Sequence, residues 1–386
     1  MKNHVVCLST TNYHPLPTRK QNVMSRLRNS EVLYFDPPVS IIAPLKDKKA
    51  SAYISKYRQP GEKVEGHENI TVYALPPVLP FFNKFRWVNR LNQKRQAAFV
   101  RRKMREHGFG DETVLWCYSP SSCDIVEQVP HSSLVYDCVD RHSAYGGLMN
   151  PELVDAMELE LAGKCSRVFA TAEPLAKRLK AANEKTAFIP NGADYERFAQ
   201  ANDEQPVPSD LKDIPHPIFG FVGALQPCVE YGYVETAAKA HPDWSFVFIG
   251  GEKPGAKLDV LRTLQNVHFL GLKPNELLPQ YLAHFDACLN LFADNALSRD
   301  VSPLKFYEYL ATGRPIVSTP QPEQVMQYAP LIQVATNPEE FSVKCAESLL
   351  DDLPERRAAR MTAGRGCSWD ARVAQMCKYL RDDKIL

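Results

Sequence analysis

The stretch Asp300-Val-Ser-Pro-Leu-Lys-Phe-Tyr-Glu308-Tyr-Leu-Ala-Thr-Gly-Arg-Pro-Ile-Val-Ser318 decides the fold of this chain. Its apolar residues recur with helical spacing as far as Gly313, which predicts an amphipathic helix, and Pro315 then opens a short buried strand. Ser302 as the cap and Pro303 as the first helical residue are typical of a helix start. A helix that leads directly into a buried strand is one step of the alternation that builds parallel sheets with helical crossovers.

The beginning of this helix has the chemistry of an anion site. The free N–H groups from Leu304 onward, together with the helix dipole, can hold a phosphate. Lys305 puts a positive charge in the first turn, which is unfavourable for the dipole unless an anion is present. Glu308, one turn further, can accept hydrogen bonds from the vicinal hydroxyls of a ribose. From these residues alone, a nucleotide site and an ordinary capped helix are equally good interpretations.

The same alternation extends over the rest of the chain. We expect strands near residues 5–9, 32–35, 69–74, 114–118, 133–137, 167–171, 187–190, 218–222, 245–249, 267–270, 287–291 and 315–318, with helices between most of them. A polar, proline-rich stretch at 199–216 interrupts the pattern and is interpreted as a linker. The prediction is therefore an α/β protein of two doubly wound, Rossmann-like domains, 1–198 and 217–368, that face each other across a ligand cleft. A C-terminal helix over 369–386 is expected to return to the first domain.

Composition and charge exclude several classes of protein. The chain has 386 residues, 44% of them hydrophobic, and no apolar run long enough for a membrane span. Its ten cysteines are scattered without metal-type spacing, which favours reduced thiols in the cytoplasm over disulfides or zinc. Residues 1–198 carry 28 Lys and Arg against 21 Asp and Glu, whereas the remainder carries 18 against 24. This asymmetry predicts an anionic partner for the first half.

The stretch that starts at Asp300 also resembles a known family. Seven residues separate Asp300 from Glu308, and the flanking text resembles the E-x7-E region of GT-B glycosyltransferases, especially family four. The resemblance implies that Glu308 binds the nucleotide ribose and that the loop amides hold the diphosphate. It also implies that Asp300, where the family has Glu, contacts the donor sugar. The variant Ser-Pro-Leu-Lys-x-x-Glu-Tyr-Leu-Ala is similar to a bacterial subgroup that makes capsule, teichuronic-type and other exopolysaccharides.

Other segments extend this resemblance over nearly the whole chain. Phe188-Ile-Pro-Asn-Gly-Ala-Asp194-Tyr-Glu-Arg-Phe198 resembles the family's P-N-G-x-D-x-x-x-F segment, and the stretch that ends at Gly271 resembles the border of the base pocket. Gly223 ends a strand in a loop where the missing Cβ lets the backbone approach a phosphate. Glu230 stands where the subgroup often has Asp, and we expect it to contact a sugar hydroxyl or, equally, to cap a helix.

A second group of candidate residues lies in the first half. Ser133–Tyr145 reads as a buried strand that runs into a polar, aromatic turn, and an acid at the carboxyl end of such a strand points into a cleft. An acceptor hydroxyl needs a nearby base, and Asp140 is the candidate. His142 is an alternative base, although a lone histidine is more often structural. Tyr145 is placed with it on the acceptor side.

The start of the first helix is expected to face the same cleft. Arg19 and Gln21 are predicted to bind an anionic acceptor there, with a solvated helix start as the alternative. The segment from Lys84 to Arg105 holds nine Lys and Arg and no acid, interleaved with aromatic and aliphatic residues. This composition favours a basic amphipathic helix on anionic lipid over a solvated face, and no RNA-binding motif supports nucleic acid.

These features together predict a GT-B glycosyltransferase. We expect it to transfer a sugar from a nucleotide diphosphate donor, UDP-linked, to a lipid-linked saccharide during surface polysaccharide assembly. It would work at the inner face of the plasma membrane and need neither a metal nor another cofactor. A non-hydrolysing sugar-nucleotide epimerase and a non-catalytic sugar-nucleotide-binding subunit are the alternatives. Stereochemistry stays open, because family-four relatives retain the anomeric configuration whereas an Asp base implies inversion.

Overall fold

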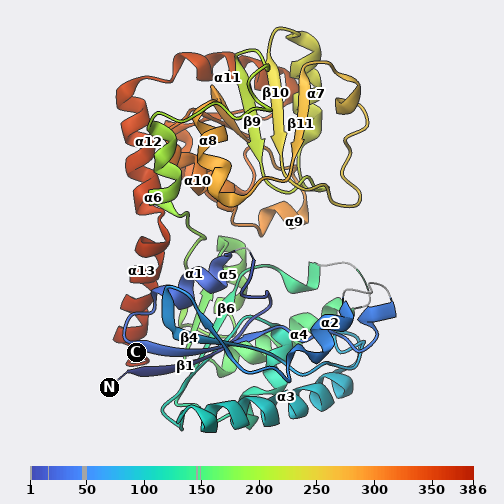
Figure 1. The fold of residues 1–386 in the computed structure, drawn as a ribbon, viewed down its shortest axis with the longest axis vertical. Coiled ribbons are helices and arrows are strands. Elements are labelled where there is room, and N and C mark those ends of the chain that lie inside the picture. Colours follow the sequence, from blue (N-terminus) through green and yellow to red (C-terminus); the bar gives the residue numbers. More distant parts are fainter. Residues whose placement is uncertain (1, 16, 46–49, 145–146, 148) are drawn as a thin grey trace. The chain divides into compact units, whose positions relative to one another are not determined.

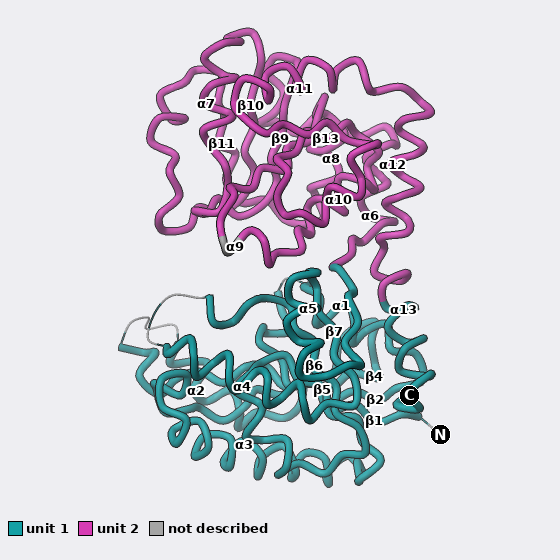
Figure 2. The backbone as a smooth tube through the Cα atoms, turned by 180° about the vertical axis from the view of Figure 1, so that it is seen from behind, with its two compact units in different colours: residues 1–190, 373–386 teal, residues 191–372 magenta. Residues whose placement is uncertain are grey.

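The computed structural model describes residues 2–15, 17–45, 50–144, 147 and 149–386. The chain divides into two compact units (Figure 2). Unit 1 comprises Met1–Pro190 together with Val373–Leu386, and unit 2 comprises Asn191–Arg372. Unit 1 is therefore built from two separate pieces of the chain.

Unit 1 is organised around an eight-stranded sheet of order β3-β4-β2-β1-β5-β6-β7-β8. All neighbours pair in parallel except β3, which is antiparallel to β4. The strands are β1 (Asn3–Leu8), β2 (Ser30–Asp36), β3 (Glu62–Val64), β4 (His67–Ala74), β5 (Val114–Cys117), β6 (Ser133–Cys138), β7 (Arg167–Ala170) and β8 (Thr186–Phe188). The order reverses between β1 and β5, so unit 1 has a topological switch point at the carboxyl ends of these strands.

The two faces of this sheet bury different side chains of each strand. In β1, Val6 and Leu8 join one core while Val5 and Cys7 join the other, because successive strand residues point to opposite faces. The first core includes residues of α3 (Arg86–Glu106), α4 (Pro151–Lys164) and α5 (Glu173–Lys180), and the second includes residues of α1 (Arg19–Arg26) and α13 (Trp369–Asp382). Figure 1 shows α3 running along the lower side of the sheet.

Unit 2 contains a six-stranded parallel sheet of order β11-β10-β9-β12-β13-β14. Its strands are β9 (Ile218–Val222), β10 (Ser245–Ile249), β11 (Val267–Gly271), β12 (Ala287–Asn290), β13 (Ile316–Ser318) and β14 (Gln333–Val334). The order of chain connection reverses between β9 and β12, which is the arrangement of a dinucleotide-binding fold. Ligands of such sheets bind outside the carboxyl ends of the strands at this switch point.

Helices pack against both faces of the second sheet as well. One core includes residues of α6 (Tyr195–Ala199), α8 (Leu278–Ala283) and α10 (Leu304–Thr312), and the other includes residues of α7 (Tyr231–Ala240) and α11 (Pro338–Leu350). The remaining helices are α2 (Ala50–Lys56) in unit 1, and α9 (Ala296–Arg299) and α12 (Pro354–Gly366) in unit 2. The prediction of two doubly wound α/β units is confirmed.

Two boundaries of the sequence prediction are wrong. The boundary between unit 1 and unit 2 lies after Pro190 rather than after residue 198, because Tyr195 and Phe198 are buried in a core of unit 2. The stretch 199–216 is not a bare linker, since Ala201 and Leu211 pack into the same core. The C-terminal helix begins in unit 2 and belongs to unit 1 from Val373 onward.

The structure also bears on solvent and membrane exposure. Over the described ranges, no helix combines the length and apolar composition that crossing a membrane requires. All ten cysteines are free, and nine of them are buried, where a thiol packs as a small hydrophobic group.

Candidate active site

The quoted stretch forms α10 and the strand that follows it. The helix begins at Leu304 and ends where Gly313 adopts a φ of 71°, and β13 follows as predicted. The buried face of α10 packs into the unit 2 core, which leaves Leu304, Lys305 and Glu308 on the partly exposed side. Within the described residues, the N–H groups of Leu304 and Lys305 have no hydrogen-bond acceptor. The start of α10 can therefore receive an anion.

Lys305 projects from this helix start toward the switch point of unit 2. Its Nζ lies 3.7 Å from the ring centroid of Phe221 in β9 and 5.0 Å from that of Phe292, which follows β12. Burial lowers the pKa of Lys305 to about 7, although Cys228 and Glu308 oppose this shift. A lysine on aromatic faces without a carboxylate at salt-bridge distance is poised to gain an anion, because a bound diphosphate would restore its charge.

Glu308 is the second titratable group of this helix start. Burial raises its pKa to about 7, and the attraction of Lys305 and Arg197 and the repulsion of Asp194 are the smaller influences. Arg197 and Asp194 belong to the P-N-G-x-D-x-x-x-F segment, so the structure brings two of the motifs together. We define the α10 site as Gly223, Lys305, Glu308 and the first N–H groups of α10.

Glycines allow three loops to meet beside Lys305. Gly223 has a φ of 140°, and a Cβ there would lie 3.2 Å from Nζ of Lys305. Gly250 has a φ of 153°, and its Cβ would fall 1.9 Å from the carbonyl oxygen of Gly223. Gly271 has a φ of 70° and accepts a hydrogen bond from the Gly250 N–H at 2.9 Å. At the carboxyl ends of β9, β10 and β11, these glycines therefore leave the backbone uncovered by side chains.

Ser302 does not have the role that was predicted for it. Pro303 is the N-cap of α10, and the Ser302 hydroxyl instead accepts a hydrogen bond from the N–H of Asn191 at 2.9 Å. The Asn191 side chain in turn donates to the Ser302 carbonyl at 2.9 Å. Ser302 thus fixes the P-N-G segment against α10. Asp300 is buried in the turn between α9 and α10, and its contact with a donor sugar stays a prediction.

Glu230 caps a helix, which is one of its two predicted roles. It is the N-cap of α7, and its Oε1 accepts a hydrogen bond from the N–H of Gly232 at 3.1 Å. The second carboxylate oxygen makes no hydrogen bond in the described part of the chain. A contact with a sugar hydroxyl is thus still open to Glu230.

In unit 1, Arg19 is a structural residue rather than an acceptor contact. It is 1% exposed, and its Nε lies 2.9 Å from Oδ2 and 3.0 Å from Oδ1 of Asp137 in β6. The guanidinium also donates to the carbonyls of Ile189 and Pro190. Asp137 therefore supports the strand end through its ion pair with Arg19. Removal of one partner of this buried ion pair would strongly destabilise the folded protein.

Gln21 is likewise occupied inside the protein. It is 3% exposed, forms a capping box with Thr18, and donates from Nε2 to the carbonyls of Asn12 and Tyr13. The prediction that Gln21 binds an acceptor is wrong because the capping box and the preceding loop use its amide. Tyr145 lies outside the described residues.

Asp140 follows β6 and lies among titratable side chains. Burial lowers the pKa of Lys20, and the charges of Asp140 and Asp137 oppose this shift. His142 donates from Nε2 to the carbonyl of Tyr118 at 3.1 Å. Burial also lowers the pKa of His142. Either Asp140 or His142 could accept a proton here, and Lys20 is their cationic neighbour.

The basic segment in α3 is partly neutralised by acids of other elements and by Glu106 at the end of the helix itself. Arg86 pairs with Asp124 at 3.0 Å and Glu160 at 2.6 Å, and Lys103 pairs with Glu106 at 2.7 Å. The exposed basic residues are Lys84, Arg90, Lys94, Arg95, Arg102 and Arg105. Two of them also contact acids, Arg90 with Asp124 and Arg102 with Glu106, each at 3.7 Å. The exposed charge is therefore smaller than the sequence count suggests. Among the described residues, no cluster of His, Cys, Asp or Glu could hold a metal, and metal independence stays a prediction.

Comparison with known proteins identifies the kind of enzyme. The family "Glycosyl transferases group 1" matches residues 216–352. The putative teichuronic acid biosynthesis glycosyltransferase TuaH of Bacillus subtilis is 25% identical over 287 residues, which cover 70% of this chain and 72% of TuaH. Among solved structures, trehalose-6-phosphate from E. coli bound with UDP-2-fluoro glucose matches with a TM-score of 0.71 and 13% identity over 98% and 99% of the two chains. Anabaena HepE in complex with UDP matches with a TM-score of 0.66 and 15% identity over 99% and 100%.

The chain is thus a glycosyltransferase with the GT-B fold. Residues 216–352, which contain the α10 site, are the part of the chain that matches the group 1 glycosyl transferase family. These findings confirm the predicted fold and enzyme class. The narrower assignment to a bacterial surface-polysaccharide subgroup stays a prediction.

Proposed function

We propose that the α10 site binds the nucleotide diphosphate of a UDP-sugar donor. The observation that carries this proposal is that Lys305 and Glu308 lie together near the open start of one helix. Lys305 and the free N–H groups would hold the diphosphate, and the Glu308 carboxylate would accept hydrogen bonds from the ribose hydroxyls. UDP or a UDP-sugar analogue is named in two of the structures described above, which supports uridine as the base.

The leaving diphosphate would be stabilised by the same groups. Charge builds on the phosphate oxygen as the glycosidic bond breaks, and a cation with aligned N–H dipoles lowers the energy of that state. Bringing Lys305 from its pKa of about 7 to the charged form links diphosphate binding to proton uptake above neutral pH. This chemistry requires no metal. Asp300 and Glu230 are the proposed contacts of the donor sugar.

A panel of nucleotide-sugars tests this assignment. Titration calorimetry of the full chain with UDP, GDP and UDP-glucose should give binding of the uridine compounds, and Lys305→Met should weaken it. Matched substitution of the exposed Lys239, in the same unit, should leave the affinity unchanged. Labelled UDP-sugars, scored for hydrolysis and for transfer, then report turnover. Failure of every nucleotide to bind, or equal binding by Lys305→Met, would remove the α10 site from the reaction.

For the acceptor we propose a lipid-linked saccharide in surface polysaccharide assembly. The name of TuaH supports a polysaccharide product. Asp140 is proposed as the general base, with His142 as the alternative. Retention of the donor configuration, detected by NMR of the product, would argue against both and assign the proton to a donor phosphate oxygen.

We also propose that the enzyme is cytoplasmic and lies on anionic membrane lipid through α3. Phe81, Phe85, Trp87 and Leu91 are 40–67% exposed near the start of this helix, which is unusual for such large apolar side chains. Lys84 and Arg90 lie exposed among them. Apolar side chains beside cations are what an interfacial helix presents to acidic headgroups.

Sedimentation with vesicles tests the membrane proposal. The wild-type chain should sediment with phosphatidylglycerol vesicles and leave them at high salt, because each basic residue contributes about 1 kcal/mol that salt screens. Trp87→Ser with Leu91→Ser should abolish this binding, whereas Leu350→Ser, at an 80% exposed leucine of unit 2, should not. Equal recovery of the wild-type chain with neutral and anionic vesicles would refute it.

A further inference from the structure

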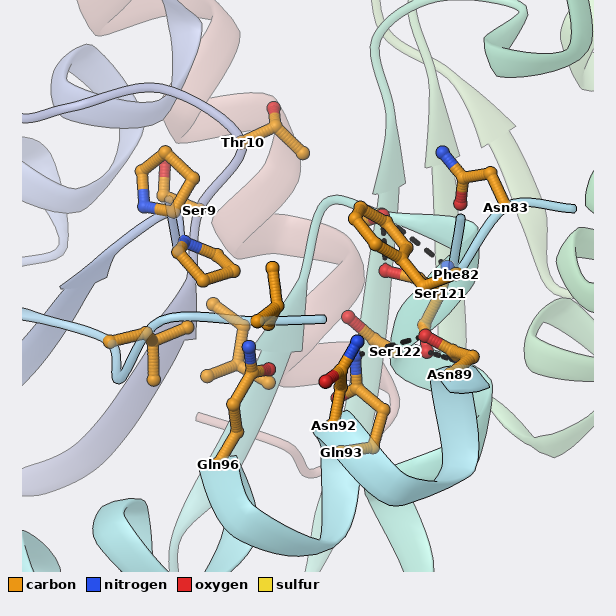
Figure 3. Close-up of a pocket in the computed structure, with 16 residues that line it drawn as sticks. Ser9, Thr10, Phe82, Asn83, Asn89, Asn92, Gln93, Gln96, Ser121 and Ser122 are labelled. Atoms are coloured by element: carbon orange, nitrogen blue, oxygen red, sulfur yellow. Dashed lines mark hydrogen bonds between the residues drawn. The ribbon is translucent and has the colours of Figure 1, made fainter. Parts of the chain in front are cut away.

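Unit 1 contains a pocket of about 220 Å³ at the carboxyl edge of its sheet (Figure 3). Its walls come from the residues that follow β1, β2, β4 and β5, and the first half of α3 closes it from one side. This position includes the topological switch point between β1 and β5, where open α/β sheets bind ligands. Its volume corresponds to that of about seven water molecules, which suits one small ring better than a chain of several. We call it the amide pocket.

The lining of the amide pocket combines uncharged polar side chains with apolar ones and carries no charge. Its polar residues are Ser, Thr, Asn and Gln, and its apolar residues are Pro, Leu, Val and Phe. Among the residues that line it, there is no Lys, Arg, Asp, Glu or His. Amides and hydroxyls both donate and accept hydrogen bonds, as sugar hydroxyls do. A phosphate or carboxylate, in contrast, would find no cation in this lining.

The helix that closes the pocket buries amides where a core helix would bury hydrocarbon. Asn89, Asn92, Gln93 and Gln96 follow helical spacing and are at most 6% exposed. From Ala97 onward the buried face becomes apolar. Buried amides destabilise a protein unless they are hydrogen-bonded, so their presence over two turns calls for partners.

Two of the four amides have strong partners inside unit 1. Asn92 accepts from the Leu79 N–H at 2.9 Å and donates to the Leu79 carbonyl at 3.0 Å. Asn89 donates to the Ser121 carbonyl at 2.8 Å and to Oδ2 of Asp124 at 2.7 Å. These two residues hold the walls together.

The other two amides remain available to a ligand. Gln93 makes one long hydrogen bond, 3.4 Å from its Nε2 to Oδ1 of Asn89. Gln96 is 3% exposed, and its Nε2 has no partner within the described residues. Figure 3 shows the Gln96 side chain rising from α3 toward the loop that carries Ser9. A buried donor that lines a pocket and has no protein partner can be satisfied by a water molecule or by a ligand in that pocket.

We propose that the amide pocket binds an uncharged sugar ring of the acceptor and that Gln96 donates a hydrogen bond to one of its hydroxyls. This inference rests on the proposed function, since it names the acceptor class of that reaction. It predicts discrimination against uronic acids and phosphorylated sugars, because their charge would be buried without a counterion. In a lipid-linked acceptor, the diphosphate would lie outside this pocket.

Binding of simple glycosides to the full chain tests the proposal. Saturation-transfer NMR in the presence of UDP would use methyl glucoside, methyl galactoside and methyl N-acetylglucosaminide as neutral probes, with methyl glucuronide and glucose 6-phosphate as charged ones. At least one neutral probe should bind, and both charged probes should bind at least ~10-fold more weakly. Gln96→Leu should raise the Kd of the neutral probe about fivefold. Gln59→Leu, at an exposed glutamine of the same unit, should leave it unchanged.

The outcomes separate this inference from the proposed function. A charged probe that binds as tightly as the neutral ones, no binding by any neutral probe, or an unchanged Kd in Gln96→Leu overturns the amide pocket as a neutral-sugar site. UDP affinity, which belongs to unit 2, shows in each variant whether the donor assignment stands. If circular dichroism shows that Gln96→Leu is unfolded, Gln93→Met takes its place with the same expected rise in Kd.

Discussion

Replacing Glu308 by Gln should stabilise the ligand-free enzyme at alkaline pH while weakening donor binding. The substitution keeps the shape of the side chain but removes the carboxylate. In the ligand-free structure this carboxylate makes no hydrogen bond within the described residues, and burial raises its pKa to about 7. The charge is therefore unfavourable until ribose hydroxyls reach it.

The magnitude follows from the pKa shift. Raising the pKa from 4.5 to about 7 corresponds to about 3 kcal/mol, at about 1.4 kcal/mol for each unit. Because the folded-state pKa is the higher one, the stability associated with Glu308 is complete below pH ~4.5 and is lost as the pH rises through ~7. The Gln variant does not titrate. It should gain about 3 kcal/mol over wild type at pH 8 but less than about 1 kcal/mol at pH 5.

Urea denaturation at the two pH values measures this gain, and calorimetry measures UDP binding. Loss of a charge-assisted hydrogen bond weakens binding by about 1.5–3 kcal/mol, or roughly ten- to hundredfold. Glu204→Gln, at an exposed carboxylate of the same unit, is the matched control and should change neither quantity. A variant less stable than wild type at pH 8, or an equal gain at both pH values, would refute the account of burial. Unchanged UDP affinity would remove Glu308 from the ribose.

Three further predictions concern other parts of the molecule. Gly223→Ala should weaken UDP binding about tenfold in calorimetry, because the φ of Gly223 is 140° and the added Cβ would press on Lys305. The control is Gly66→Ala, where φ is 76° and no atom lies within 4 Å of the added Cβ. This control should leave the UDP affinity unchanged. Asp140→Asn should lower kcat about 10²–10⁴-fold with UDP affinity preserved, and near-normal turnover would exclude it as the base. Asp137→Asn should destabilise the enzyme to urea by about 3–5 kcal/mol because Arg19 keeps a buried, unpaired charge, and a loss below about 1 kcal/mol would contradict this.

Sequence analysis located most elements of the fold because local signals define them. The helix from Leu304 to Thr312 has its apolar stripe, its closing glycine and the strand behind it within one short stretch. The strands of both sheets are apolar runs between turn residues. Short elements such as α2 and β14 were missed because they lack such a pattern. The P-N-G segment was assigned to the wrong unit because the local sequence does not show which core Phe198 packs into.

The candidate site shows the same limit at the level of side chains. Arg19 and Asp137 lie 118 positions apart, and no local pattern indicates that they neutralise each other. The basic residues of α3 indicated a lipid-facing surface, but nothing in that pattern indicated that Gln96 and its polar neighbours on the same helix are buried. The helical spacing of these polar residues, in register with the apolar stripe of the same helix, was the signal that could have indicated their burial. The residues of the α10 site were found because they are close together in sequence.

The division of the chain has a consequence for how the enzyme is made. Unit 2 is continuous, but it is inserted into unit 1, whose second core needs Val373, Met376 and Leu380 from α13. During synthesis, unit 1 therefore cannot complete its second core until all of unit 2 has left the ribosome. Unit 2 can complete its fold first. Removal of residues 373–386 would expose an apolar face of unit 1. It would leave residues 216–352, which match the glycosyl transferase family, intact in sequence.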